Sequence, residues 1–382
     1  MARMITAGLA FAHGVAFAVA AQAVPPPPPI ATITVPPAGP AREQGLLMWM
    51  PGPVSCAGGP APAAQTIRRP LNRLIYPPAQ PAAPVVLRFA VSAEGRPLSI
   101  ERQPGEGANV YSYFGEDIAP ALAASRFAPG TPAAACTITY TPRFAAAAEA
   151  PVAELVSYSV TPVGGRLPQA GWDRIGARAD CFQSPQPQPL LRAFPDFATV
   201  PATPGVRDWS LIAFDIDGEG RPVRTERKAG TGNAALDRAA IQAVATSRFA
   251  GGARTGCSYP YWRVPGLLAA PAMPAVAEPE DGPCARTGNW AVEPRLVYPA
   301  AYRARAIEGW AVLSYDVASW GQIGNVRVVA AQPSTDFGTA AKAMLEAARR
   351  PEGPGATGCQ TRVSYRMAGE GAPSGGDGAG ES

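Results

Sequence analysis

Six cysteines divide this chain of 382 residues into three similar segments. They fall into consecutive pairs whose members lie 80, 76 and 75 residues apart. The pairs are Cys56 with Cys136, Cys181 with Cys257, and Cys284 with Cys359. Disulfides persist in oxidising compartments. The regular spacing therefore predicts three modules, each closed by its own disulfide, in a protein that leaves the cytosol.

Two runs of β-forming residues, separated by a glycine turn, lie inside each pair. The runs are 86–91 and 100–102, 211–216 and 225–227, and 311–317 and 326–329. The first two turns share the sequence Glu-Gly-Arg-Pro, and the third turn contains Gly321. This pattern is typical of a β-hairpin. Its recurrence indicates an internal repeat, which constrains the fold before any other feature.

A helical stretch follows each hairpin, and a last strand begins at or near each second cysteine. The predicted helices are 118–127, 236–249 and 340–349, and the predicted last strands are 136–140, 257–261 and 359–365. In the second copy, Leu236, Ala240 and Val244 recur at helical spacing. The predicted fold class is therefore α+β, with three tandem small modules. Each is a short antiparallel sheet (strand, strand, helix, strand) with one or two packed helices and one disulfide.

An aromatic residue followed by proline precedes each hairpin. These steps are Tyr76-Pro77, Phe194-Pro195 and Tyr298-Pro299, and the third continues into a short predicted helix at 300–304. Each first cysteine lies upstream of its step, so we expect the disulfide to tie this entry segment to the last strand. The alternative is that the cysteines are metal ligands or free thiols. It is disfavoured because no Cys-x-x-Cys occurs and His13 is the only histidine.

These patterns define the expected organisation of the chain. Residues 1–23 are a signal peptide or an N-terminal anchor, and residues 24–45 are a proline-rich linker. The three modules span residues 46–146, 150–265 and 280–368. Residues 369–382 are a disordered tail, because their glycine-rich composition lacks the apolar residues that a packed core needs.

The third copy resembles the C-terminal domain of the TonB energy-transducer family. It has Tyr298-Pro299, a strand that opens with Gly309-Trp310-Ala311-Val312, a turn at Gly321-Gln322-Ile323 and an alanine-rich helix that ends in Arg349-Arg350-Pro351. The second copy keeps the hairpin and Leu236-Asp237-Arg238-Ala239-Ala240. The first copy keeps the entry Tyr-Pro and the exit Arg-Phe-Ala-Pro. The three copies together cover most of residues 70–367.

The resemblance implies a periplasmic domain that binds an extended peptide of an outer-membrane receptor by adding a strand to its sheet edge. The expected partners are thus envelope or outer-membrane proteins. Candidate partner-binding residues lie on the last strand of the third module: Gln360, Arg362, Ser364 and Arg366. Alternatively, the sheet edges pair with neighbouring modules or are covered, because an exposed edge strand promotes aggregation. The sequence leaves both interpretations open.

The amino terminus distinguishes two functional roles. Arg3, an apolar run at 4–21 and a cleavage motif that ends at Ala23 are typical of a secretory signal peptide. The alternative is an uncleaved inner-membrane anchor facing the periplasm, as in a TonB-type energy transducer. His13 lies in the run, where family anchors also have a histidine, but Leu9 replaces the serine that they place before it. Cleavage is favoured because the run is rich in alanine and glycine and weakly hydrophobic.

Other functional classes are disfavoured. A net charge of +4 with 16% charged residues is too small and too scattered for a nucleic-acid surface. The cleaved chain would contain no histidine, and no Gly-x-Ser-x-Gly, Ser-x-x-Lys or phosphate loop occurs. A calcium-loop-like pattern starts at Asp215, but its position in the repeat predicts a hairpin turn. We therefore expect a non-enzymatic protein without cofactor or metal, which contacts a membrane only if residues 1–23 are retained.

Overall fold

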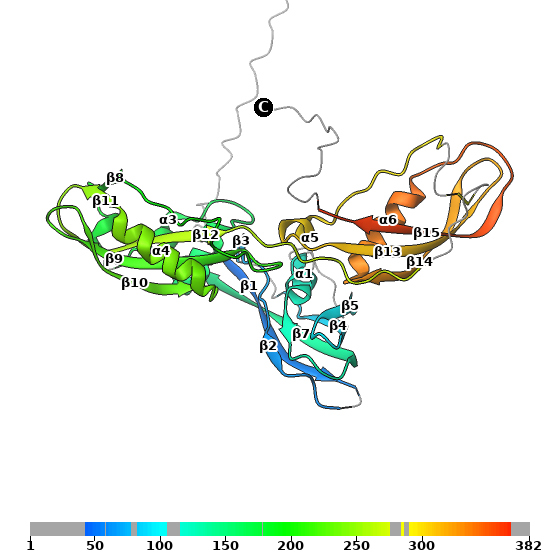
Figure 1. Ribbon diagram of the computed structural model, residues 1–382, viewed down its shortest axis with the longest axis horizontal. Coiled ribbons are helices and arrows are strands. Elements are labelled where there is room, and N and C mark those ends of the chain that lie inside the picture. Colours follow the sequence, from blue (N-terminus) through cyan, green and yellow to red (C-terminus); the bar gives the residue numbers. More distant parts are fainter. Residues whose placement is uncertain are drawn as a thin grey trace, which may run out of the picture. The chain divides into compact units, whose positions relative to one another are not determined.

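The computed structural model describes residues 43–57, 59–77, 82–104, 115–177, 179–275, 284–285 and 290–367 (Figure 1). All of these residues belong to one compact unit, which begins at Arg42. The predicted signal peptide or anchor at 1–23, nearly all of the linker at 24–45 and the predicted tail at 369–382 lie outside the described residues.

Three antiparallel sheets carry the strands that the repeat predicts. The first has the order β3 (Arg73–Ile75), β1 (Gly45–Cys56), β7 (Ala133–Ala146), β4 (Val85–Val91) and β5 (Pro97–Arg102). The second has the order β10 (Pro222–Gly230), β9 (Asp208–Ile216) and β12 (Arg254–Arg263). The third has the order β14 (Ile323–Gln332), β13 (Gly309–Val317) and β15 (Ala356–Tyr365). In each sheet the first hairpin strand lies between the second hairpin strand and the last strand.

One helix follows the hairpin in each segment: α1 (Ile118–Ala123), α4 (Ala234–Thr246) and α6 (Thr335–Glu346). Figure 1 shows α4 against the second sheet and α6 against the third. The side chains of Asn233 and Ser334 cap α4 and α6 by accepting hydrogen bonds from the backbone N–H groups of Leu236 and Asp336. The three helices end earlier than the sequence predicts, because the chain passes into extended structure at Arg126 and Arg248.

The extended residues after each helix pair with the entry segment of the same sheet. In the first segment, β6 (Arg126–Phe127) pairs with β2 (Ala64–Thr66), and in the second, β11 (Arg248–Ala250) pairs with β8 (Gln188–Leu191). In the third, a single bridge joins Val292 to Arg349. These pairings close each sheet and helix into a compact layer.

A residue three or four positions beyond the end of each helix also binds the glycine of its hairpin turn. The backbone N–H groups of Phe127, Phe249 and Arg350 donate to the carbonyl oxygens of Gly95, Gly220 and Gly321, at 3.0, 2.9 and 2.8 Å. Gly321 has φ +83°, a conformation that glycine adopts most readily. A Cβ atom at this position would overlap the carbonyl oxygen of Arg350. The turn glycine is therefore required both for its backbone conformation and for this close approach.

Two helices and one short 3₁₀ helix have no counterpart in the sequence prediction. They are α2 (Val152–Val160), α3 (Gln169–Ile175) and η2 (Asp180–Phe182). Buried residues of α2 and α3 pack with Leu46 and Met48 of β1 and with Trp209 of β9. The helices are too short for their apolar periodicity to stand out from the flanking sequence.

The first and third sheets share one hydrophobic core, whereas the second sheet has its own. The backbone N–H of Ile100 in β5 donates to the carbonyl of Pro333, which directly precedes the N-cap of α6, at 2.9 Å. Ile100 and Ser334 also form a parallel bridge. The sheets that the sequence predicts as separate modules are thus joined through backbone pairing as well as apolar contacts.

Candidate functional site

Strand β15 forms one edge of the third sheet. It runs antiparallel to β13, with Tyr365 opposite Gly309 and Cys359 opposite Tyr315. Among the strands that the structure describes, β13 alone pairs with β15. We call the opposite side of this strand the β15 edge. On this side the backbone groups of β15 pair with no other described strand.

The side chains of β15 alternate between the core and the exterior. Cys359, Val363 and Tyr365 are buried. The candidate residues from the sequence prediction are Gln360, Arg362, Ser364 and Arg366, which alternate with these buried positions. Gln360, Ser364 and Arg366 are exposed, and Arg362 is half-buried. The four side chains therefore share the face of the sheet that points away from the core of this strand.

Glu308 holds the carboxyl-terminal end of β15 in place. Its Oε2 accepts from Nη1 of Arg366 at 2.8 Å, and its Oε1 accepts from the backbone N–H of Met367 at 2.9 Å. The backbone N–H of Ala270 also donates to this carboxylate, at 3.4 Å. Burial raises the pKa of Glu308, but these hydrogen bonds outweigh it and leave the pKa below its ordinary value. Glu308 is therefore a carboxylate that fixes both the strand end and the segment after the second sheet.

Aromatic rings in edge-to-face contact form the core behind β15. The ring centroid of Tyr365 lies 5.5 Å from that of Tyr298 and 5.1 Å from that of Phe337. The hydroxyl of Tyr298 donates to the carbonyl of Ile307 at 2.6 Å, and burial raises the pKa of Tyr298 to about 12. The aromatic-proline step thus packs directly beneath the last strand, and α5 (Ala300–Ala304) follows it at the predicted position.

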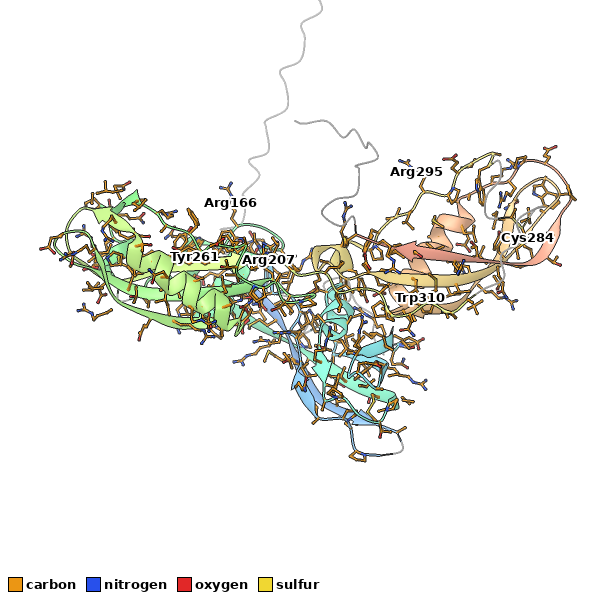
Figure 2. The ribbon with its side chains drawn as sticks, viewed as in Figure 1. Arg166, Arg207, Tyr261, Cys284, Arg295 and Trp310 are labelled. Atoms are coloured by element: carbon orange, nitrogen blue, oxygen red, sulfur yellow. A yellow bond between two sulfur atoms is a disulfide. The ribbon has the colours of Figure 1, made fainter. Side chains whose placement is uncertain are left out.

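The chain that enters the third segment runs beside the start of β13. Leu268 and Ile307 form a parallel bridge, and the indole N–H of Trp310, labelled in Figure 2, donates to the carbonyl of Pro271 at 2.9 Å. These contacts fix the connection from the second sheet near the Glu308 end of β15.

The last strand of the first sheet lacks an open edge. Strand β1 pairs with β7 along its length, from Gly45 opposite Ala146 to Cys56 opposite Cys136. Leu47 and Trp49 of β1 are buried in the core of the first sheet, and Leu46 and Met48 are buried against α2. The first residues of β1 are therefore covered on both faces, and the strand occupies the edge of β7.

The sequence pattern does not predict β1. Its first residues, Gly-Leu-Leu-Met-Trp-Met, lie where the predicted proline-rich linker meets the predicted first module. A continuous apolar run of this kind is a signal for a strand buried on both faces. The predicted first module begins at Leu46 but assigns no strand to this run, because the hairpin repeat has no equivalent of it.

Three disulfides join Cys56 to Cys136, Cys181 to Cys257, and Cys284 to Cys359, the pairs that the spacing predicts. Each attaches an incoming segment to the last strand of a sheet. In the first sheet this segment is β1 rather than the entry segment with Tyr76, which corrects the expectation for that disulfide. In the second it is η2, which carries Cys181. Cys284 is labelled in Figure 2.

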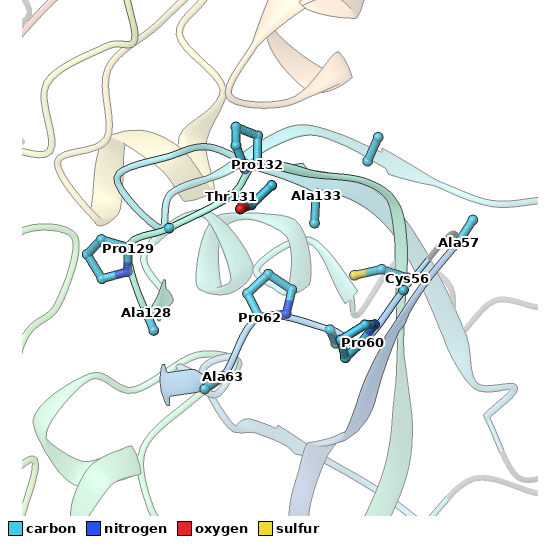
Figure 3. A pocket seen from close by; sticks show the side chains of 14 residues that line it. Cys56, Ala57, Pro60, Pro62, Ala63, Ala128, Pro129, Thr131, Pro132 and Ala133 are labelled. Carbon is cyan, nitrogen blue, oxygen red and sulfur yellow. The ribbon is translucent and has the colours of Figure 1, made fainter.

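Neither the pocket beside Cys56 nor the calcium-loop-like turn forms a metal site in the described residues. A cavity of about 510 Å³ beside Cys56 is lined mainly by prolines and alanines, with no charged side chain (Figure 3). The calcium-loop-like turn is a hairpin turn, in which Oδ1 of Asp217 accepts from the backbone N–H groups of Glu219 and Arg221 at 3.0 and 2.8 Å. Within the described ranges, no three His, Cys, Asp or Glu side chains group as a metal site.

None of the helices in the part of the chain that the structure describes combines the length and apolar character needed to cross a bilayer.

Residues 294–367 match the family model described as Gram-negative bacterial TonB protein C-terminal. This match covers α5, the third sheet and α6. It confirms the resemblance for the third segment. No curated protein matches the chain.

Proposed function

Because residues 294–367 form a TonB C-terminal domain, we propose that this chain binds an extended peptide of an envelope or outer-membrane protein along the β15 edge. The observation that carries this proposal is that, among described strands, β15 pairs with β13 alone. TonB C-terminal domains are periplasmic, interact with outer-membrane proteins and are non-enzymatic in general. We therefore propose that this protein is a binding module of the Gram-negative periplasm.

The chemistry of the β15 edge supports this mode of binding. An added strand gains affinity from backbone hydrogen bonds, and alternate side chains provide selectivity. Gln360 and Ser364 offer neutral polar groups, whereas the charge of Arg366 is balanced by Glu308. We therefore expect a peptide that is extended and polar.

We also propose that the three sheets are copies of one module. They share the strand order, the disulfide position and the hydrogen bond to the turn glycine. The residue four positions after each turn glycine adopts a positive φ in every copy: Ser99 at 51°, Arg224 at 53° and Asn325 at 51°. Shared strain at equivalent positions is more typical of repeated modules than of three unrelated sheets.

The copies differ in whether their last strand is available. Strand β7 is covered by β1, so the first sheet cannot accept a peptide at that edge. Among described strands, β12 pairs with β9 alone, but η2 packs against it through the Cys181–Cys257 disulfide. We therefore propose the third sheet as the peptide-binding site and rank the second sheet as the next candidate.

A membrane-anchored energy transducer for receptor-dependent transport is the second candidate function. The apolar run at 4–21, followed by the proline-rich stretch at 25–40, supports it. The amino-terminal sequence of the mature protein, taken from fractionated cells, separates the two roles. A start at Val24 in the soluble periplasmic fraction supports the free binding module. An intact Met1 in the inner-membrane fraction supports the transducer.

A photo-crosslinking amino acid installed on the last strand tests peptide binding directly. Ser364 lies five residues after Cys359, and the matched control, Thr141, lies five residues after Cys136 on the covered strand β7. Both positions are exposed. We expect crosslinks to an envelope protein from position 364 and none from position 141. Equal crosslinking from both positions, or none from either, would count against strand addition at β15.

A further inference from the structure

A cavity lined by arginines lies at the junction of the first and second sheets. Its volume is about 430 Å³, within the range of small-molecule sites. Five arginines line it: Arg68, Arg69, Arg207, Arg227 and Arg305. We call it the arginine cavity. Glu154 is the acidic residue of the lining. Positive groups therefore outnumber negative ones at its wall.

Three of the five arginines are neutralised by partners within the fold. Arg69 pairs with Glu154. Arg227 pairs with Asp237 at 2.9 Å, and Arg305 pairs with Asp117 at 2.5 Å. The positive charges of these three side chains are therefore balanced by carboxylates of the fold.

Arg68 and Arg207 differ from the other three. Neither guanidinium has an ion pair or hydrogen bond among the residues that the structure describes, and Nε of Arg68 is buried without a hydrogen-bond partner. Burial lowers the pKa of the Arg68 guanidinium below its ordinary value; the charge of Asp208 opposes this shift and that of Arg305 adds to it. The group nevertheless stays charged, because arginine is not deprotonated in proteins. A desolvated cation without a direct partner is costly unless a ligand supplies one.

The nearest acid does not fill this role. Asp208 is 1% exposed and does not line the cavity. Its carboxylate accepts hydrogen bonds from Thr203, Thr231 and Asn233, at 2.6, 2.9 and 2.8 Å. These neutral donors hold the carboxylate in the wall behind the cavity. The guanidinium of Arg68 remains available to a group inside it.

The remaining lining suits a small polar molecule. The hydroxyl side chains of Ser157 and Thr161 lie on the α2 side, and Val206 and Trp209 supply apolar surface. Guanidinium groups bind phosphate and carboxylate oxygens through paired, charge-assisted hydrogen bonds. We propose that the arginine cavity binds a small multivalent oxyanion, whose charge is held by Arg68 and Arg207. This inference is independent of peptide binding at β15.

Isothermal titration of the full chain at constant ionic strength tests the proposal. The probes are pyrophosphate and citrate, which present phosphate and carboxylate oxygens respectively, with chloride as the background anion. We expect one site per chain for at least one probe, and the preferred probe identifies the oxyanion class. Arg68→Gln and Arg207→Gln should each weaken binding about tenfold or more, because each removes a charge-assisted contact.

A matched variant controls for the loss of one positive charge. Arg295 is exposed, lies outside the cavity and is labelled in Figure 2, so Arg295→Gln should leave binding unchanged. Arg207 is only half-buried, and its variant keeps the test informative if Arg68→Gln impairs folding. Absence of saturable binding for both probes overturns the proposal. Binding that Arg207→Gln leaves unchanged, or that Arg295→Gln weakens equally, overturns it as well.

Discussion

Arg305 and Asp117 form a buried ion pair with two points of contact. Nε and Nη2 of Arg305 donate to the two carboxylate oxygens of Asp117, at 2.6 and 2.5 Å. The side chains are 7% and 15% exposed. Arg305 follows α5 of the third segment, and Asp117 precedes α1 of the first. The same guanidinium donates to the carbonyls of Gly205 and Arg69, at 3.2 and 3.1 Å. One side chain thus links all three segments.

Asp117→Asn should destabilise the fold strongly. It leaves the charge of Arg305 buried without a counter-charge, and breaking a buried pair in this way costs about 3–5 kcal/mol. The measurement is the midpoint of urea unfolding. Lys342→Gln is the control, because it breaks an exposed pair with Glu346 that contributes at most about 0.5 kcal/mol. Similar midpoints for the two variants would show that the buried pair does not hold the segments together.

Gly321→Ala should also lower stability, by more than about 2 kcal/mol. Alanine is disfavoured at φ +83°, and its Cβ would displace the backbone of Arg350 from the turn. Gly324→Ala is a matched control in β14, because an added Cβ meets no atom there and the backbone is not left-handed. Thermal unfolding of both variants measures the difference. A Gly321→Ala protein as stable as the Gly324→Ala protein would contradict the assigned role of the turn.

The acid dependence of stability should include a contribution from Glu308. Its pKa in the folded chain is lowered, so its stabilising effect is present above the unfolded value of about 4.5 and is lost as the pH falls through the folded pKa. Glu308→Gln should lower the unfolding midpoint at neutral pH and flatten its fall on acidification. Glu293→Gln, at an exposed position, should show the same pH dependence of the unfolding midpoint as the unaltered protein. Parallel profiles for Glu308→Gln and the unaltered protein would rule out this contribution.

Removing the third disulfide should destabilise the domain that carries the β15 edge. Cys284→Ala with Cys359→Ala opens a loop of about 75 residues, which corresponds to about 2–4 kcal/mol. The measurement is the free energy of unfolding of the double variant. It is compared with that of the unaltered protein, with and without reductant. Peptide mapping without reduction should recover the three intrasegment crosslinks. A crosslink between segments would contradict both the pairing and the proposed module boundaries.

Local sequence patterns predicted the parts of the fold that rest on local chemistry. The hairpins follow from β-forming runs around the turn glycines, and α5 follows from the residues after Tyr298-Pro299. In the structure, the alternation of side chains along β15 places Gln360 and Ser364 on the face away from the core. The family resemblance of the third segment rested on the same local motifs.

Long-range contacts account for what the sequence did not predict. Strand β1 begins with an apolar run because the core of the first sheet and α2 bury opposite faces of it, so this run lacks the alternation of a half-buried strand. The partners of Arg305 lie up to 236 residues away in sequence. The arginine cavity draws on five separate parts of the chain and has no local signature. Only the folded arrangement brings these residues together.

Amide hydrogen exchange of the full chain, with and without a peptide from the crosslinked envelope partner, tests strand addition at β15 most directly. Backbone pairing with an added strand should protect the amides of Ala356–Tyr365, while Ala133–Ala146 of β7, already paired with β1, should show no change. Saturable peptide binding with no added protection in β15 would contradict the proposed mode of recognition.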